Sequence, residues 1–375
     1  MSALSLTESD LASSRISFTG RAEFILKVAL LFSSPLLLIL ILEGAAFLWE
    51  QKQSNSLFAW ELVASRRIDL VSYPEPGAGY TLMKPGSHYG WQGIPVDINS
   101  HGLRGPEIPF EKPDDTYRIL NLGDSVAMGW GVKEDETYGR RLEGLLNRQA
   151  TGNLQYQVIN AGIPGWNLEN ELAYLQAVGK EYQPDLVLLD LTIVNDIYGK
   201  SALLQHDRPA LIEWLRANTY FWPFLTVQLR WLEASLEGRE RIDVIDPPTK
   251  PSSYFPLDTS DGRWSNIWDL LTEMNRLSHE NGARFVILLF PLEFQVLDEN
   301  YATIPQEFFS AKAREAGIPV LDLLPAFRQA CRQKPGDSCS REDRYLFADV
   351  WMHPSAHGHR LTAEELYLFL DGSLE

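Results

Sequence analysis

Apolar residues in the second half of the chain form short continuous runs, and segments with helical periodicity separate them. The runs lie at 117–123, 156–162, 185–194, 283–290 and 318–324. The helical patterns lie at 137–149, 167–181, 263–281, 304–316 and 355–371, the last with Ser355 as a candidate N-cap. Continuous apolar strands that alternate with helices are typical of a parallel sheet covered on both faces. We therefore expect an α/β fold over residues 116–375, a flavodoxin-like three-layer α/β/α sandwich with a five-stranded parallel sheet.

A longer apolar stretch precedes this domain. The 22 residues from Val28 to Trp49 contain one charged residue, Glu43, and about 20 apolar residues are enough for a helix to span a bilayer. A cleavable signal peptide is the alternative, although apolar residues continue past Gly44-Ala45-Ala46, a poor match to a cleavage site. We expect a single transmembrane anchor at 28–49.

Charged residues around this stretch predict its orientation. Arg15, Arg21 and Lys27 precede it, whereas only Lys52 follows within about 15 residues. The positive-inside rule then makes 1–27 a cytoplasmic tail and places the rest outside the cytoplasm, in the periplasm or its equivalent. The expected location is that of a single-pass membrane protein with a cytoplasmic N-terminus.

The expected location outside the cytoplasm favours a disulfide between the two cysteines. Cys331 and Cys339 lie eight positions apart in a polar segment with a Pro-Gly turn signal. In an oxidising compartment a disulfide closing so short a loop would stabilise the fold by about 2–3 kcal/mol. An inverted topology would leave two free thiols instead.

Charge excludes one class of partner. The formal net charge is −17 and the pI about 4.9, so the chain repels phosphate backbones and nucleic acid is not expected as a partner. The composition gives no indication of oligomeric state.

Two segments lie outside the predicted strands and helices. Residues 50–115 are rich in Gly and Pro and predict an irregular or β-rich lead-in outside the core. Residues 197–262 form an insertion between the third and fourth strands that is dense in aromatic residues: Trp214, Tyr220, Phe221, Trp222, Phe224 and Trp231. This insertion is either a lid that binds substrate or a small helical subdomain with its own core.

Polar residues that could take part in catalysis lie at the predicted strand ends. The first strand ends in Gly123-Asp124-Ser125, where a turn would expose the serine hydroxyl beside backbone N–H groups, as a nucleophile requires. Ala127 breaks the G-x-S-x-G elbow, which disfavours an ordinary α/β-hydrolase. Gly162 and Asn195 end the next two strands and could bind an oxyanion. Near the C-terminus, His353 could act as a base with Asp349 orienting it.

The order of these groups resembles the SGNH (GDSL-type) hydrolase family over about 116–371. The resemblance implies that Ser125 is the nucleophile, that its own amide, Gly162 and Asn195 form the oxyanion hole, and that His353 is the base. The segments VDINSHGLRGPE and RILNLGDS are similar to those of membrane-anchored bacterial members.

Two positions depart from the family pattern. Ile193 stands where the family has Gly two residues before the Asn, and Val350 where it has Asp three residues before the His. Asp349, one residue earlier, either orients His353 or is a structural carboxylate, with a backbone carbonyl orienting the imidazole.

A zinc site is the competing interpretation of His353, His357 and His359. Pro354 and Gly358 interrupt the helical spacing, and no Cys or Glu lies in the segment. We therefore expect neither a metal nor a cofactor.

These expectations combine into an extracytoplasmic serine esterase or acyltransferase that acts on ester groups of cell-envelope glycans, O-acetyl above all, through an acyl-enzyme. A lipid esterase or thioesterase of the same fold is the alternative substrate class. A non-catalytic protein of glycan assembly is the alternative outside the enzymes, although such a protein would not need Ser125 and His353.

Overall fold

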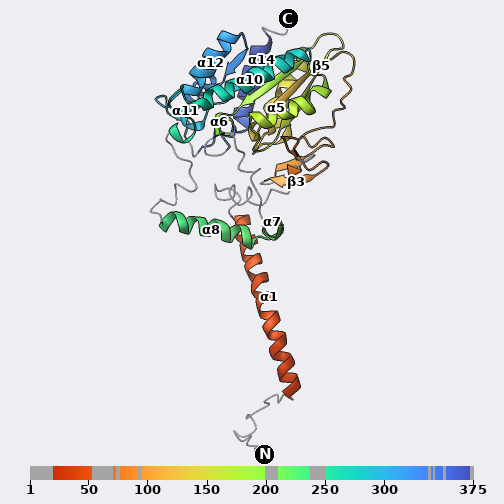
Figure 1. Cartoon of the computed structure of the whole chain (residues 1–375), viewed down its shortest axis with the longest axis vertical. Helices are drawn as coiled ribbons and strands as arrows, with labels where there is room; N and C mark the ends of the chain where they lie inside the picture. The colour runs from red at the N-terminus through yellow and green to blue at the C-terminus, as the bar shows by residue number, and fades with distance from the viewer. Residues whose placement is uncertain are drawn as a thin grey trace, which may run out of the picture.

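The computed structural model describes residues 20–52, 71–72, 77–91, 94–198, 210–236, 251–336, 339–340, 343–348 and 352–371. One long helix, α1 (Gly20–Lys52), stands apart from a layered α/β domain in Figure 1. Helices α7 (Ala210–Asn218) and α8 (Phe221–Leu236) lie across the end of α1 that is nearer the domain. Within the described ranges, no helix combines the length and the apolar character needed to cross a membrane.

The domain is built on the five-stranded parallel sheet that the sequence predicts. Its strands are β5 (Thr116–Gly123), β6 (Gln155–Gly162), β7 (Leu186–Leu191), β8 (Arg284–Leu289) and β9 (Val320–Asp322). They pair in the order β6-β5-β7-β8-β9, all parallel, which is the flavodoxin-like order. Every residue of β7 is buried because this strand is central and covered on both faces.

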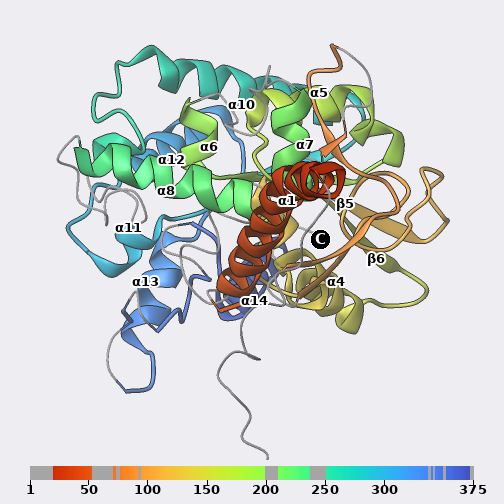
Figure 2. The ribbon, with the colours of Figure 1, turned by 90° about the horizontal axis from the view of Figure 1, so that it is seen from below.

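Helices cover the two faces of the sheet. On one face α4 (Tyr138–Gln149) packs against the last helix, α14 (Ala356–Asp371). On the other face α5 (Leu168–Ala177) packs against α10 (Gly262–Glu280), and Figure 2 shows the two pairs on opposite sides of the domain. The structure also describes helices α3 (Ser125–Met128), α6 (Ile193–Tyr198), α11 (Glu293–Leu297), α12 (Ile304–Ala316) and α13 (Leu324–Arg332), with 3-10 turns η3 (Glu134–Glu136), η4 (Gly179–Tyr182) and η5 (Pro251–Ser253).

The third strand is shorter than the sequence predicts. It ends at Leu191 rather than at residue 194, and α6 begins at Ile193, so Asn195 lies on a helix. The Thr192 carbonyl accepts hydrogen bonds from the backbone N–H groups of Asn195 and Asp196, at 3.1 and 3.3 Å. An apolar run does not distinguish strand from helix, which explains the difference. At α14 the prediction is confirmed, because the Ser355 hydroxyl accepts the Gly358 N–H at 3.2 Å and caps the helix.

The lead-in contributes to the core, contrary to our expectation. It contains two small antiparallel pairs, β1 (Val71–Ser72) with β2 (Leu82–Met83) and β3 (His88–Trp91) with β4 (Ile94–Asp97). Five of its apolar side chains are buried in the main core: Tyr80, Met83, Val96, Ile98 and Leu103. The sequence did not indicate their burial, because the alternation of apolar and polar residues over strands of two to four residues is too short to recognise.

The part of the insertion that the structure describes contains α7, α8 and η5, and the choice between a lid and a helical subdomain stays a prediction. No side chain that the structure describes in α7 or α8 is buried, so these helices show no core of their own. Helix α8 contacts α1. Residues 199–209 and 237–250 of the insertion lie outside the described residues. The chain rejoins the core at Tyr254 and Phe255, which are buried.

Candidate active site

Ser125 and His353 meet at the carboxyl end of β5. The Ser125 Oγ lies 2.8 Å from His353 Nε2, although the two residues are 228 positions apart in the chain. Both side chains are nearly buried, with 7% and 3% of their surface exposed. The sequence had placed both at strand and helix ends, and the fold brings them into hydrogen-bond contact.

Local residues hold Ser125 at the first position of α3. The Asp124 carboxylate caps this short helix by accepting the Val126 N–H at 2.7 Å. The helix ends at Gly129, whose φ of +86° is in the left-handed region that favours glycine. A Cβ there would lie 2.3 Å from the Thr137 side chain, so the turn and the start of α4 pack too closely for another residue.

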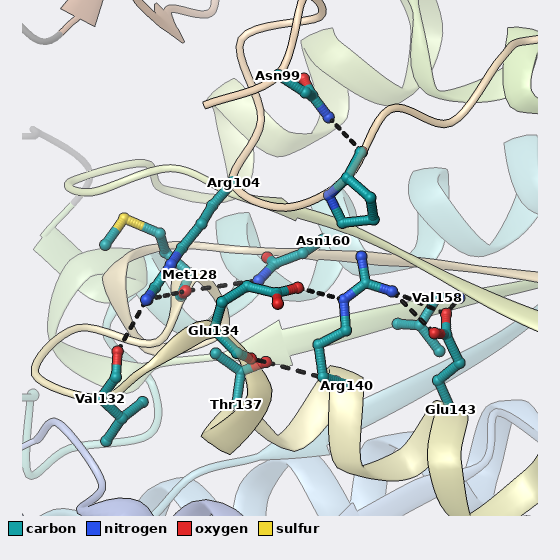
Figure 3. Close-up of polar contacts among 11 residues, drawn as sticks. Asn99, Arg104, Met128, Val132, Glu134, Thr137, Arg140, Glu143, Val158 and Asn160 are labelled. Carbon is teal, nitrogen blue, oxygen red and sulfur yellow. Dashed lines mark hydrogen bonds and ion pairs between the residues drawn. The ribbon is translucent and has the colours of Figure 1, made fainter. Parts of the chain in front are cut away.

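Arg104, from the lead-in, holds the far side of this turn. Its guanidinium donates to the backbone carbonyls of Met128, Gly129 and Val132, at 3.2, 2.7 and 2.8 Å. The side chain is 2% exposed, and Figure 3 shows it reaching across the loop that follows α3. A buried cation with three acceptors on one loop fixes the position of that loop. Sequence reasoning had given Arg104 no role.

A second set of contacts in Figure 3 ties the next segment to the sheet. Arg140 of α4 bonds Glu134 of η3 at 2.5 Å and Glu143 at 2.9 Å. The Glu143 carboxylate in turn accepts the N–H of Val158 in β6 at 2.7 Å. The turn that carries Ser125 is therefore joined to rigid elements at both ends.

The His353 segment is held by backbone bonds and by one aromatic ring. The Ala348 N–H donates to the His353 carbonyl at 2.7 Å, and Phe347 forms an isolated bridge with Pro354. The Trp130 ring stacks on the imidazole, with centroids 5.6 Å apart and planes 25° apart. Asp349 and Val350 lie outside the described residues, so the orienting role of Asp349 stays a prediction.

Asn195 lies close to the serine through Asp124. Its side-chain NH₂ donates to the Asp124 carboxylate, which also caps the serine helix. An amide NH₂ carries two hydrogens, and the second can be donated to an oxyanion. Asn195 therefore lies beside the turn that carries Ser125, although it belongs to α6 and not to the end of β7.

Gly162, which we expected to bind an oxyanion through its N–H, ends β6 and packs against α3. Its N–H donates to the Asn160 side chain at 3.1 Å. A Cβ at this position would lie 2.2 Å from the Met128 backbone nitrogen, so close packing against α3 requires glycine here. Gly165, in the turn that follows, has a φ of +79°. Among the described residues its N–H has no acceptor.

Four buried carboxyl groups lie around this site: Asp124, Asp190, Asp196 and Glu171. Burial raises the pKa of each of them, and the charge of Asp124 raises the pKa values of Asp190, Asp196 and Glu171 further. For Asp124 the capped Val126 N–H and the nearby His353 act in the opposite direction and lower its pKa. These contacts offset part of the rise that burial causes in the pKa of Asp124.

The three C-terminal histidines do not converge. His353 faces Ser125, whereas His357 stacks on Tyr345 at 4.2 Å and accepts a hydrogen bond from Arg360. His359 is fully buried and accepts the Tyr138 N–H at 3.2 Å. Burial, and then the charge of Arg104, lower the pKa of His359 to about 3. Within the described ranges no cluster of three His, Cys, Asp or Glu side chains forms a metal site.

The two cysteines form a disulfide with Cα atoms 5.2 Å apart. Cys331 is at the end of α13 and is buried, while Cys339 packs against the core. The disulfide closes the loop that leads toward the His353 segment.

Comparison with known proteins identifies the domain. The model of the GDSL-like lipase/acylhydrolase family matches residues 122–361. No curated protein matches the chain.

Among solved structures, TesA covers 68% of this chain and 98% of its own, at 17% identity and a TM-score of 0.39. The acetyl xylan esterase AlAXEase covers 67% and 98%, at 14% identity and a TM-score of 0.42. The psychrotrophic esterase EstA from Pseudoalteromonas sp. covers 70% and 99%, at 16% identity and a TM-score of 0.37.

Proposed function

Because the chain belongs to the GDSL-like lipase/acylhydrolase family, we propose that it is a serine esterase with Ser125 as nucleophile and His353 as general base. The hydrogen bond of 2.8 Å between Ser125 Oγ and His353 Nε2 carries this proposal. A nucleophilic serine needs a base within about 2.6–3.2 Å. The capped, braced turn around Ser125 supplies the rigidity that such a pair requires.

In the proposed reaction, Ser125 Oγ attacks the ester carbonyl carbon while His353 Nε2 takes its proton. The Ser125 N–H and the second hydrogen of the Asn195 amide stabilise the negative oxygen of the tetrahedral intermediate. The protonated imidazole then donates its proton to the leaving alkoxide, and an acyl-enzyme remains. Water, activated by His353, releases the acid, or a sugar hydroxyl accepts the acyl group in a transferase.

The third oxyanion donor is one of two backbone amides. Gly162 can serve only if the Asn160 side chain turns away from its N–H. Gly165 needs no such change among the described residues, because its N–H has no acceptor there. Gly165 has a left-handed backbone conformation in the turn after β6. A Pro-Gly pair at this position in the sequence indicates such a turn.

We also propose that α1 anchors the esterase in a lipid bilayer, with the domain outside the cytoplasm. The described residues of α1 do not by themselves meet the length and apolar character of a membrane-spanning helix, so this proposal rests on the full sequence of the stretch 28–49. Six consecutive residues of α1, Leu36 to Ile41, are each more than half exposed. Six consecutive helical positions occupy every side of a helix, so α1 offers apolar side chains all round. With an extracytoplasmic domain, O-acetyl groups of cell-envelope glycans become the proposed substrate.

Labelling with a fluorophosphonate probe tests the serine. The purified full chain should react once, and Ser125→Ala should lose both the label and most turnover of a chromogenic acetyl ester. Ser265→Ala, which changes an exposed serine of α10, should keep both. The double variant Ser125→Ala with His353→Ala should be little worse than either alone, because the two groups act as a unit. Near wild-type turnover in Ser125→Ala would contradict the proposal.

A panel of acetyl, butyryl and longer acyl esters distinguishes the substrate classes. A preference for acetyl esters supports the glycan proposal. A preference for long acyl chains would favour the lipid esterase instead.

A further inference from the structure

We propose that α7 and α8 lie flat on a lipid surface and are fastened to α1 through Glu43, so that the esterase domain is held at a fixed orientation above the bilayer. This inference rests on the anchoring role that we propose for α1. It assigns a function to the aromatic insertion that is separate from substrate binding.

The first observation is a contact between residues 177 positions apart. The Glu43 carboxylate accepts the backbone N–H of Tyr220 at 2.6 Å and that of Phe221 at 3.2 Å. These are the amides at the N-terminus of α8, which have no carbonyl partner within the helix and carry partial positive charge. The one charge of the apolar stretch 28–49 is thus matched by the end of a second helix.

An aromatic pair lies one turn further along α1. Phe47, four residues after Glu43, packs edge-to-face with Tyr220, with ring centroids 5.0 Å apart and planes at 81°. Positions four apart share one face of a helix. The start of α8 therefore docks on one defined face of α1 through a polar and an aromatic contact.

The second observation is that α7 and α8 expose apolar side chains. Leu211 and Trp214 on α7 are each more than half exposed, and so are Leu229 and Leu232 on α8. Each pair is three residues apart, a spacing that places both members on one side of their helix. Figure 1 shows α8 running across the axis of α1 rather than along it.

A bilayer surface fits this arrangement better than a protein partner. A partner protein covers one side of a helix, whereas α1 exposes apolar residues on every side. A membrane that surrounds α1 would meet α8 where it crosses the end of α1, parallel to the surface, as amphipathic interfacial helices lie. An exposed Trp, as at position 214, is typical of that depth.

Nitroxide labels on the full chain in vesicles of phosphatidylethanolamine and phosphatidylglycerol test this arrangement. Single labels go on Leu229→Cys in α8, Leu38→Cys in α1 and Leu368→Cys in α14, all exposed positions. The native cysteines form a disulfide and do not react with the reagent. Turnover of an acetyl ester shows that each labelled variant is folded.

The readout is collision with oxygen, which enters lipid, against collision with a nickel chelate, which stays in water. We expect the labels at 38 and 229 to favour oxygen and the label at 368 to favour nickel. A label at 229 that behaves like the one at 368, with 38 in lipid, would overturn the docking of α8 and leave the anchor intact. A label at 229 shielded from both reagents would mean that protein covers this face, which also overturns the proposal. Nickel access at 38 would refute the anchor itself.

Discussion

The lead-in and the insertion lie outside the five strands, yet they have opposite relations to the site. The lead-in, poor in regular structure, sends five apolar side chains into the core and one arginine to the serine turn. The insertion, rich in aromatic residues, has no buried side chain among those described in α7 and α8 and contacts α1 instead. Aromatic content therefore did not indicate which segment belongs to the core.

The difference lies in what each segment finds to pack against. The lead-in is fixed to the sheet by paired contacts, such as the ion pair of Lys112 with Asp185 at 2.7 Å and the Trp166 indole bonded to Thr81 at 3.2 Å. Helix α8 is held to α1 at its N-terminus, through the contacts of Tyr220 and Phe221 with Glu43 and of Tyr220 with Phe47. A segment becomes part of an active site through its partners, not through its composition.

The largest expected effect comes from removing Arg104. Arg104→Ala removes three hydrogen bonds of a buried charged group, each worth about 1.5–3 kcal/mol. The Val132 carbonyl loses its donor, whereas the Gly129 carbonyl keeps the Val132 N–H at 3.3 Å. We expect the free energy of unfolding to fall by at least about 3 kcal/mol and kcat to fall about 10²-fold as the serine turn shifts. Urea denaturation and ester turnover measure both quantities.

The control for Arg104 is Arg276→Ala on α10. That arginine is half exposed and bonds only neighbouring glutamates of its own helix, so it should change little. A kcat within twofold of wild type in Arg104→Ala would mean that the lead-in packs on the site without positioning it.

A smaller effect should appear as a pH dependence at His359, which is buried beside the turn that Arg104 braces. Its pKa in the folded protein is about 3, below the unfolded value of about 6.5. The unfolded chain therefore binds one more proton between these values, and stability falls as the pH is lowered through that window. The slope is about 1.4 kcal/mol per pH unit, or about 2 kcal/mol between pH 6.5 and pH 5.

His359→Gln isolates this contribution. The buried carboxyls have raised pKa values and act in the opposite direction, stabilising the fold as the pH falls, but both proteins share them. The stability difference between wild type and His359→Gln should therefore change by about 2 kcal/mol in favour of the variant from pH 7 to pH 5. A constant difference would show that His359 has the same pKa in the folded and the unfolded protein, which contradicts the effect of its burial.

The smallest effect is expected from Glu43, which binds the start of α8 in the insertion. Glu43→Gln weakens an N-terminal helix cap, a contact worth about 0.5–2 kcal/mol. Turnover of a soluble ester should stay unchanged, while a nitroxide at Leu229→Cys should become more mobile. Glu23→Gln, on the exposed first turn of α1, should leave the label as it was. A large loss of turnover in Glu43→Gln would place the insertion in the active site.

The sheet was predictable because its signals are local, whereas the pairing of Ser125 with His353 was predicted from the order of the motifs, which resembles a known family. Each strand is an apolar run, and parallel strands bring their carboxyl ends to one edge, where Ser125 lies. Arg104 could not be found in this way, since a lone arginine in a Gly-rich segment has no periodicity. The contact of Glu43 with the start of α8 joins residues 177 positions apart, and neither segment has a sequence pattern that predicts the other as its partner. The hydrogen bond from the Gly162 N–H to the Asn160 side chain depends on one rotamer of Asn160, which the sequence does not specify.

The 228 positions between Ser125 and His353 also decide when the enzyme becomes active. A chain is made from its N-terminus, so all five strands, the last ending at Asp322, are synthesised before the base. A serine without its base is a weak nucleophile. In the mechanism that we propose, hydrolysis therefore begins only when α14 packs on α4 and places His353 against Ser125. This mechanism predicts that a chain without residues 352–371 does not hydrolyse esters, although it contains Ser125 and all five strands.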